Sequence, residues 1–197
     1  MAIAAIGISS RKALALLDDQ SGYYDPGRLM ELTGLEPKQL QQALRMAENR
    51  TLRWVVSRFT RNLQGELSES ERVQITLRAL RTRIRVSNAS KEGVAARMWA
   101  GVYQMNLRRF GVGRPTGSGY TVSRRYEEGG FLAQMRSGHE GVFRRVTSRR
   151  LPVLEQGVPI KQHAWQAVEI IMNDAEEKLA KELKQSIKYL QSKNGVR

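Results

Sequence analysis

Apolar residues recur at three- and four-residue spacing in two long stretches of the sequence. The first stretch runs from Pro37 to about Gln64 and carries Leu40, Ala43, Leu44, Ala47, Leu52, Val55, Val56, Phe59 and Leu63. The second runs from Lys161 to Ser192 and carries Ala164, Val168, Ile171, Ala175, Leu179, Leu183, Ile187 and Leu190. This spacing places the apolar side chains on one face of a helix. The pattern predicts two long amphipathic helices, the first ending at Gly65 and the second closed by Asn194–Gly195.

Shorter helices are indicated by their capping residues. Asp25 followed by Pro26 is typical of a helix start, and Gly34 provides the stop. Ser68 with Glu71 three residues later forms a capping-box pattern, which predicts a helix to about Leu80. Residues 10–19 have the composition of another short helix, and residues 1–8 read as a strand or a docking arm.

The middle of the sequence has the alternation of strands. Residues 81–86, Arg-Thr-Arg-Ile-Arg-Val, alternate Arg with apolar or small residues, as in a half-exposed strand. Residues 94–107 predict a strand with Trp99 and Tyr103 on one face, and residues 111–120 predict a glycine-rich loop. Further short strands are expected at residues 120–126, 130–135, 141–145 and 151–154.

These elements together predict an α+β fold, with N-terminal helices, a central antiparallel strand-rich region and a long C-terminal helix. We divide the chain into residues 1–36, an N-terminal arm with short helices, and residues 37–197, a single α+β domain. The domain ends in the long helix at residues 161–192.

Charge is distributed unevenly along the chain. The net charge is +14, and residues 72–150 contain seventeen basic and four acidic side chains, so nearly all of the excess lies there. Sixteen of these seventeen cations are Arg, whose planar guanidinium pairs bidentately with carboxylate or phosphate. Arg interleaved with apolar residues favours a folded surface that contacts a partner, although a solvated basic face would have the same composition.

The sequence offers little for catalysis or metal binding. It has no Cys, and its two histidines, His139 and His163, have no third ligand at a recognisable spacing. The glycine-rich segment lacks the Gly-Lys-Ser/Thr ending of a phosphate loop, and no Gly-x-Ser-x-Gly elbow is present. We therefore expect no catalytic residues, no cofactor and no metal. No apolar run is long enough to span a membrane.

One segment carries a recognisable motif. It begins with Gly-Phe and continues through Gly-His and Gly-Val-Phe-x-Arg to Arg-Leu-Pro-Val, with the matching residues Gly130, Phe131, Gly138, His139, Gly141, Val142, Phe143, Arg145, Arg150, Leu151, Pro152 and Val153. Gly138 and Gly141 suit the positive backbone angles of a tight turn between strands. Phe131, Val142 and Phe143 are candidate core or interface anchors, and Pro152 suits an edge strand.

This motif resembles the prophage minor tail protein Z family, the tail-completion proteins of long-tailed phages, over roughly residues 40–190. The resemblance implies a non-catalytic virion protein that completes the head-proximal end of the tail and enables head-tail joining after assembly in the host cytoplasm. It implies as partners the tail terminator, the tail tube and the head-tail connector, and a homo-oligomeric ring, for which we expect six-fold symmetry.

The Arg residues of the strand-rich region are then candidates for contact with acidic neighbours or with packaged DNA: Arg81, Arg83, Arg85, Arg124, Arg125, Arg144, Arg145, Arg149 and Arg150. The alternative function is a basic nucleic-acid-binding protein without catalysis, which the Arg excess supports. No membrane partner is expected.

Overall fold

The computed structural model describes residues 3–7, 26–91 and 95–193 and has the predicted α+β class. Its described residues form two compact units, each built from several parts of the chain. Unit 1 comprises the described residues within Met1–Ala4, Phe59–Arg83 and Gly101–Ala167, and unit 2 comprises those within Ala5–Arg58, Ile84–Ala100 and Val168–Arg197. The two long helices, α3 (Pro37–Ser70) and α5 (Lys161–Lys193), each contribute residues to both units.

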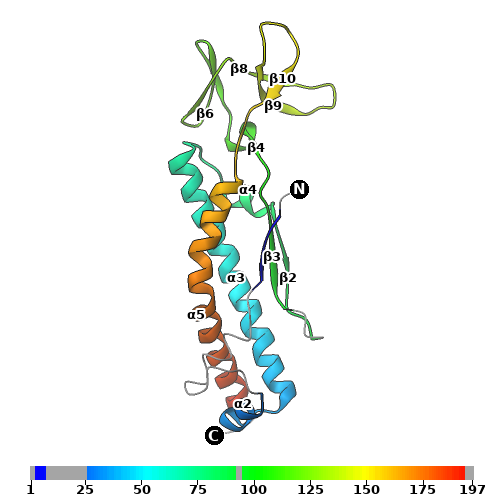
Figure 1. Ribbon diagram of the computed structural model, residues 1–197, viewed down its shortest axis with the longest axis vertical. Coiled ribbons are helices and arrows are strands. Elements are labelled where there is room, and N and C mark those ends of the chain that lie inside the picture. Colours follow the sequence, from blue (N-terminus) through cyan, green and yellow to red (C-terminus); the bar gives the residue numbers. More distant parts are fainter. Residues whose placement is uncertain (1–2, 8–25, 92–94, 194–197) are drawn as a thin grey trace. The chain divides into compact units, whose positions relative to one another are not determined.

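Unit 2 is built mainly from helices that bury the predicted apolar stripes. The α3 and α5 segments lie side by side (Figure 1), and Arg50 pairs with Glu182 at 3.7 Å. The helix α2 (Pro26–Thr33) ends where predicted, because Gly34 adopts a positive φ of 63°. The buried residues from the two stripes include Leu40, Ala43, Ala47, Leu52, Val55, Ala175, Leu179, Leu183, Ile187 and Leu190.

A small sheet lies mostly in unit 2. Its strand order is β1 (Ile3–Gly7), β3 (Arg97–Gly101), β2 (Ile84–Ser87), and β2 pairs antiparallel with β3. Side chains of α3 hold the connecting backbone, since Asn49 Oδ1 accepts a hydrogen bond from the Ala89 N–H at 2.7 Å and Glu48 Oε2 accepts one from the Ala96 N–H at 3.2 Å. The strand predicted at residues 81–86 begins later, at Ile84. The helix predicted at residues 10–19 lies outside the described residues.

The helix α3 continues beyond Gly65, so the predicted stop there is wrong. Glycine in a helix interior costs only about 1 kcal/mol relative to Ala, and the next turn buries Leu67 completely. The separate helix predicted from Ser68 is also wrong. The chain leaves α3 through Arg72, whose φ is 56°, and a short helix α4 (Leu77–Arg81) follows, with Thr76 as its N-cap.

The glycine-rich segment at residues 111–120 contains strands, contrary to the loop predicted there. Strands β5 (Arg114–Thr116) and β6 (Gly119–Val122) pair antiparallel around Gly117, whose φ is 54°. Strand β7 (Arg125–Glu128) pairs with β6 and completes a three-stranded sheet of unit 1. Gly117 is required at the turn between β5 and β6 because the backbone conformation there is left-handed.

The strand predicted over residues 94–107 is broken into parts. Strand β3 ends at Gly101, and β4 (Met105–Asn106) pairs instead with β11 (Gly157–Val158). A 3-10 turn, η1 (Leu107–Phe110), follows because the Asn106 side chain accepts a hydrogen bond from the Arg108 N–H and caps it. Tyr103 lies between β3 and β4, so the shared strand face proposed for Trp99 and Tyr103 does not form.

The motif forms the second three-stranded sheet of unit 1. Its strand order is β10 (Val153–Glu155), β9 (Glu140–Arg145), β8 (Gly130–Gln134), and all pairs are antiparallel. Phe131 lies opposite Phe143, and Arg144 lies opposite both Gly130 and Leu154. Val142 and Phe143 are buried as expected, and β10 is an edge strand with Pro152 directly before it.

Candidate interaction site

The Gly-His motif is the turn between β8 and β9. The Gly138 N–H donates to the Met135 carbonyl at 2.9 Å, and Gly138 has a φ of 81°, which confirms the predicted role of this glycine. Gly141 is different, because it lies inside β9 and is buried. A Cβ atom at Gly141 would stand 2.8 Å from Asn106 Nδ2 and 3.1 Å from the Phe143 ring. Gly141 is therefore needed for close packing and does not supply a positive φ.

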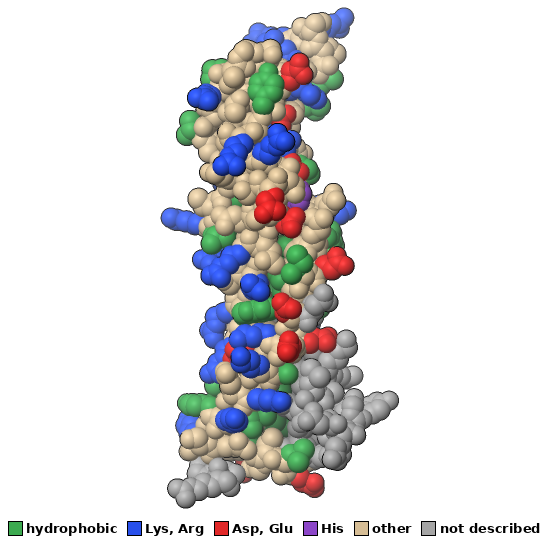
Figure 2. Space-filling view, turned by 90° about the vertical axis from the view of Figure 1, so that its left-hand side faces the viewer, with side chains coloured by type: hydrophobic (Ala, Val, Ile, Leu, Met, Phe, Trp, Pro, Cys, Tyr) green, Lys and Arg blue, Asp and Glu red, His purple; other side chains and the backbone are tan. Residues whose placement is uncertain are grey.

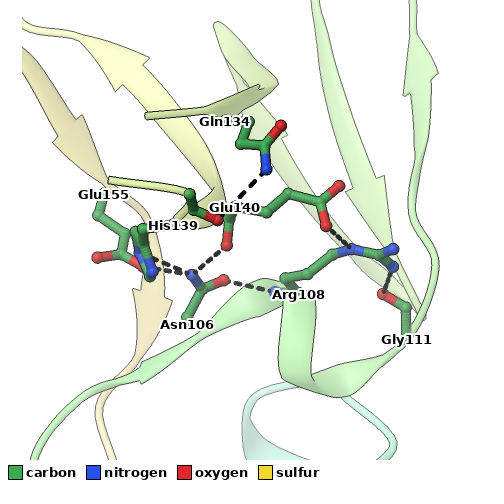
Figure 3. Close-up of polar contacts among 8 residues, drawn as sticks. Asn106, Arg108, Gly111, Gln134, His139, Glu140 and Glu155 are labelled. Atoms are coloured by element: carbon green, nitrogen blue, oxygen red, sulfur yellow. Dashed lines mark hydrogen bonds and ion pairs between the residues drawn. The ribbon is translucent and has the colours of Figure 1, made fainter. Parts of the chain in front are cut away.

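His139 belongs to a polar network that joins three segments of unit 1 (Figure 3). Its Nε2 atom lies 2.9 Å from Glu155 Oε1. Asn106 Nδ2 donates to the Glu140 carbonyl at 3.2 Å and also to Glu155 Oε1. Arg108 Nε lies 3.4 Å from a carboxylate oxygen of Glu140. The network fixes β4 and η1 against the β9–β10 edge of the sheet.

The network lines a cleft of about 440 Å³, formed by Arg83, Tyr103, Gln104, Asn106, Arg108, Arg109, His139, Glu140, Glu155, Gln156 and Gly157. These residues include neither a Ser or Thr hydroxyl nor a thiol that could serve as a nucleophile beside the His139–Glu155 pair. Acidic and basic side chains both face the cleft, so it does not form a simple anion site.

Arg83 is held in this cleft by Tyr103. Its guanidinium lies 4.1 Å from the centre of the Tyr103 ring, and its Nη1 donates to the Tyr103 carbonyl at 3.0 Å. Burial lowers the pKa of Arg83; the nearby Tyr103 opposes this shift and the positive charge of Arg109 adds to it. A guanidinium remains charged after such a shift, so Arg83 contributes a positive charge to the cleft.

Four of the nine Arg residues proposed from the sequence lie together at one end of the motif sheet. Arg144 and Arg145 end β9, and Arg149 and Arg150 lie in the connection to β10; all four are exposed. We call residues 144–154 the arginine hairpin. Arg145 lies 5.4 Å from the centre of the Phe131 ring. The exposed aliphatic side chains of the hairpin are Val146, Leu151 and Leu154.

The other five Arg residues have different surroundings. Arg81 is exposed at the end of α4, Arg124 is exposed in the β6–β7 turn, and Arg85 is exposed on β2 of unit 2. On the face shown in Figure 2, Asp and Glu side chains (red) lie among the Lys and Arg side chains (blue).

Arg125 is part of an internal ion network of unit 1. Its Nε donates to Glu127 Oε1 at 2.6 Å, and its Nη1 donates to Glu71. Burial alone lowers the pKa of Arg125, but the hydrogen bond to Glu127 and the charges of Glu127 and Glu71 raise it overall. Glu71 also lies 3.0 Å from Nε2 of His163, which is buried. The charge of Arg125 is thus satisfied within the protein.

Several contacts of the site could not be predicted from the sequence, because their residues are brought together only by the fold. Glu155 and His139 meet through the β9–β10 pairing, and Glu71 and Arg125 are 54 positions apart. Asn106 directly before a short turn has an N-cap pattern that could have been found. Within residues 3–7, 26–91 and 95–193, no cluster of three or more His, Asp or Glu side chains could hold a metal ion, and no helix could span a membrane.

The fold and this site define a small α+β protein that exposes Arg and aliphatic side chains on a hairpin. The family model for prophage minor tail protein Z (GPZ) matches residues 28–192, so the chain belongs to this family. The match confirms the resemblance carried by the motif. No curated protein and no solved structure matches the chain. The chain is therefore a bacteriophage minor tail protein with a structural role in the virion.

Proposed function

We propose that this protein completes the head-proximal end of the phage tail and enables the tail to join a filled head. The observation that carries the proposal is the family match over residues 28–192, which includes α3, all of α5 except its last residue, and the whole motif sheet. The protein acts by contact and catalyses no reaction. Its neighbours are the tail terminator, the tail tube and the head-tail connector.

A ring of identical subunits fits this position. A tail tube has a rotational axis, and a subunit that completes its end repeats around that axis through contacts between neighbouring copies. We propose six copies in the ring. The exposed Arg and aliphatic side chains of the arginine hairpin support a contact with another tail protein, because Arg is enriched in protein interfaces and apolar side chains form their centres.

Inactivation of the gene in the phage that encodes it tests the proposal. Negative-stain electron microscopy of the lysate should show filled heads and unattached tails, and the intact gene supplied in trans should restore joined, infectious particles. Joined particles without the protein would refute head-tail joining as its function.

Nucleic-acid binding without catalysis is the second candidate. The observation that favours it is the excess of thirteen positive charges within residues 72–150. Contacts with DNA phosphates release counterions, so this binding would weaken steeply as the salt concentration rises. Tight salt-sensitive DNA binding by the purified protein, together with normal particles after gene inactivation, would move this candidate to the front.

A further inference from the structure

The arginine hairpin combines uncompensated positive charge with exposed aliphatic surface. We propose that it docks on an acidic surface with an apolar centre, and that this surface belongs to a different protein and not to a second copy of this chain. The assignment rests on the proposed function, since it identifies the chemistry of one neighbour in the tail.

The charge of the hairpin has no internal counterpart. Residues 144–154 include four Arg and no Asp or Glu. The next residue, Glu155, is already engaged by His139 and Asn106. Arg145 contacts the Phe131 ring, and none of the four guanidinium groups pairs with a carboxylate of the described residues. A partner that supplies carboxylates would therefore neutralise charge that the protein leaves open.

The aliphatic side chains distinguish a protein partner from DNA. Leu151 is 68% exposed, Leu154 is 54% exposed and Val146 is 52% exposed. Leu154 lies directly opposite Arg144 across β10 and β9, so apolar and positive side chains alternate over the same small area. Contact with phosphates would use the Arg residues and leave these side chains in water. A protein interface would bury them.

The carboxylates of the strand-rich region argue against the same region of a second copy as the partner. Within the described residues 101–167 there are four carboxylates, and three are engaged: Glu127 by Arg125, Glu140 by Arg108, and Glu155 by His139. Only Glu128 remains in this range, so the strand-rich region of a second copy offers too few carboxylates to match four Arg residues.

The base of the hairpin is held in place before binding. Its strands pair in register, with Val153 opposite Arg145, and the Val146 N–H donates to the Pro152 carbonyl at 3.2 Å. A preformed surface loses little conformational freedom on association, which favours affinity.

The test uses tails purified from the phage with this gene inactivated, mixed with labelled purified protein and separated by sedimentation. The first variant, V146S/L151S/L154S, removes the aliphatic contacts and keeps every charge. The second variant, R149E/R150E, reverses two charges. The matched control, R114E/R136E, reverses two exposed Arg residues outside the hairpin. Short double-stranded DNA is the second probe, and circular dichroism verifies that each variant is folded.

We expect the serine variant to bind the tails at least about tenfold more weakly than wild type while its DNA binding stays unchanged. The glutamate variant should also lose tail binding, and the control should keep it. Equal tail binding by the serine variant and wild type would overturn the assignment. The assignment would also be overturned if loss of DNA binding explained the whole effect of R149E/R150E on tail binding. Failure of wild type to bind the tails would instead refute the proposed function, and this assignment with it.

Discussion

Replacement of Arg125 by Met tests the ion network inside unit 1. Met keeps much of the side-chain volume but leaves Glu71 and Glu127 without their shared cation. The side chains of Arg125, Glu71 and Glu127 are 26%, 17% and 14% exposed, so the network is mostly shielded from water. Loss of the network should therefore lower the free energy of unfolding by more than the loss of a surface ion pair.

The size of the effect follows from this intermediate burial. Removing one partner of a fully buried ion pair costs about 3–5 kcal/mol, and a surface pair contributes about 0–1 kcal/mol. We expect R125M to lower the free energy of unfolding by about 2–3 kcal/mol. For a chain of this length each kcal/mol shifts Tm by about 2–4 °C, so Tm should fall by roughly 4–12 °C.

Urea unfolding followed by circular dichroism measures the change. R124M is the matched control, because Arg124 is adjacent and exposed, and it should change stability by less than about 0.5 kcal/mol. Combining R125M with E71Q should cost less than the sum of the two single changes, since the removed groups interact. If R125M were as stable as R124M, Arg125 would not be needed to neutralise Glu71 and Glu127.

The raised pKa of Arg125 also fixes the sign of its pH dependence. A cation whose folded pKa lies above its unfolded value stabilises the fold at every pH below the unfolded value. This contribution is lost only as the pH rises through the folded pKa. The difference in the free energy of unfolding between R125M and wild type should therefore stay constant as the pH rises through the neutral range, because Arg125 remains charged there. A decline of this difference caused by deprotonation of Arg125 in that range would contradict the assignment.

Three further substitutions test the packing, each by urea unfolding. Phe59→Ala should destabilise by about 3–5 kcal/mol, because Phe59 is fully buried; a cost below about 1 kcal/mol would contradict its place in the core. Gly65→Ala should stabilise α3 by up to about 1 kcal/mol, since its Cβ meets nothing within 4 Å; destabilisation would show that the helix does not continue there. Gly141→Val should destabilise by about 1–3 kcal/mol, as its side chain would collide with Asn106 and Phe143; an unchanged stability would refute the close approach.

The long helices could be predicted from the sequence because each buries one continuous apolar stripe. Both begin at the predicted residues, Pro37 and Lys161. The local signals failed where tertiary contacts outweighed them. Gly65 and Ser68 have the properties of a stop and a cap, but burial of Leu67 favours continuing the helix through them.

The strand-rich region was less accessible because its strands are short and its contacts are distant in sequence. The hairpin at residues 114–122 depends on pairing between β5 and β6, and the glycine-rich composition of this segment alone is typical of a loop. Arg125 and Arg149 both belong to the same basic excess, yet one pairs with Glu71 and the other is exposed. Only the register of the strands and the end of α3 distinguish them.

Cryo-electron microscopy of the joined phage particle shows directly whether this chain completes the tail. We expect density for the chain at the head-proximal end of the tail, repeated six times around the tail axis. Density at the opposite end of the tail, or no copy of the chain in the particle, would contradict this expectation.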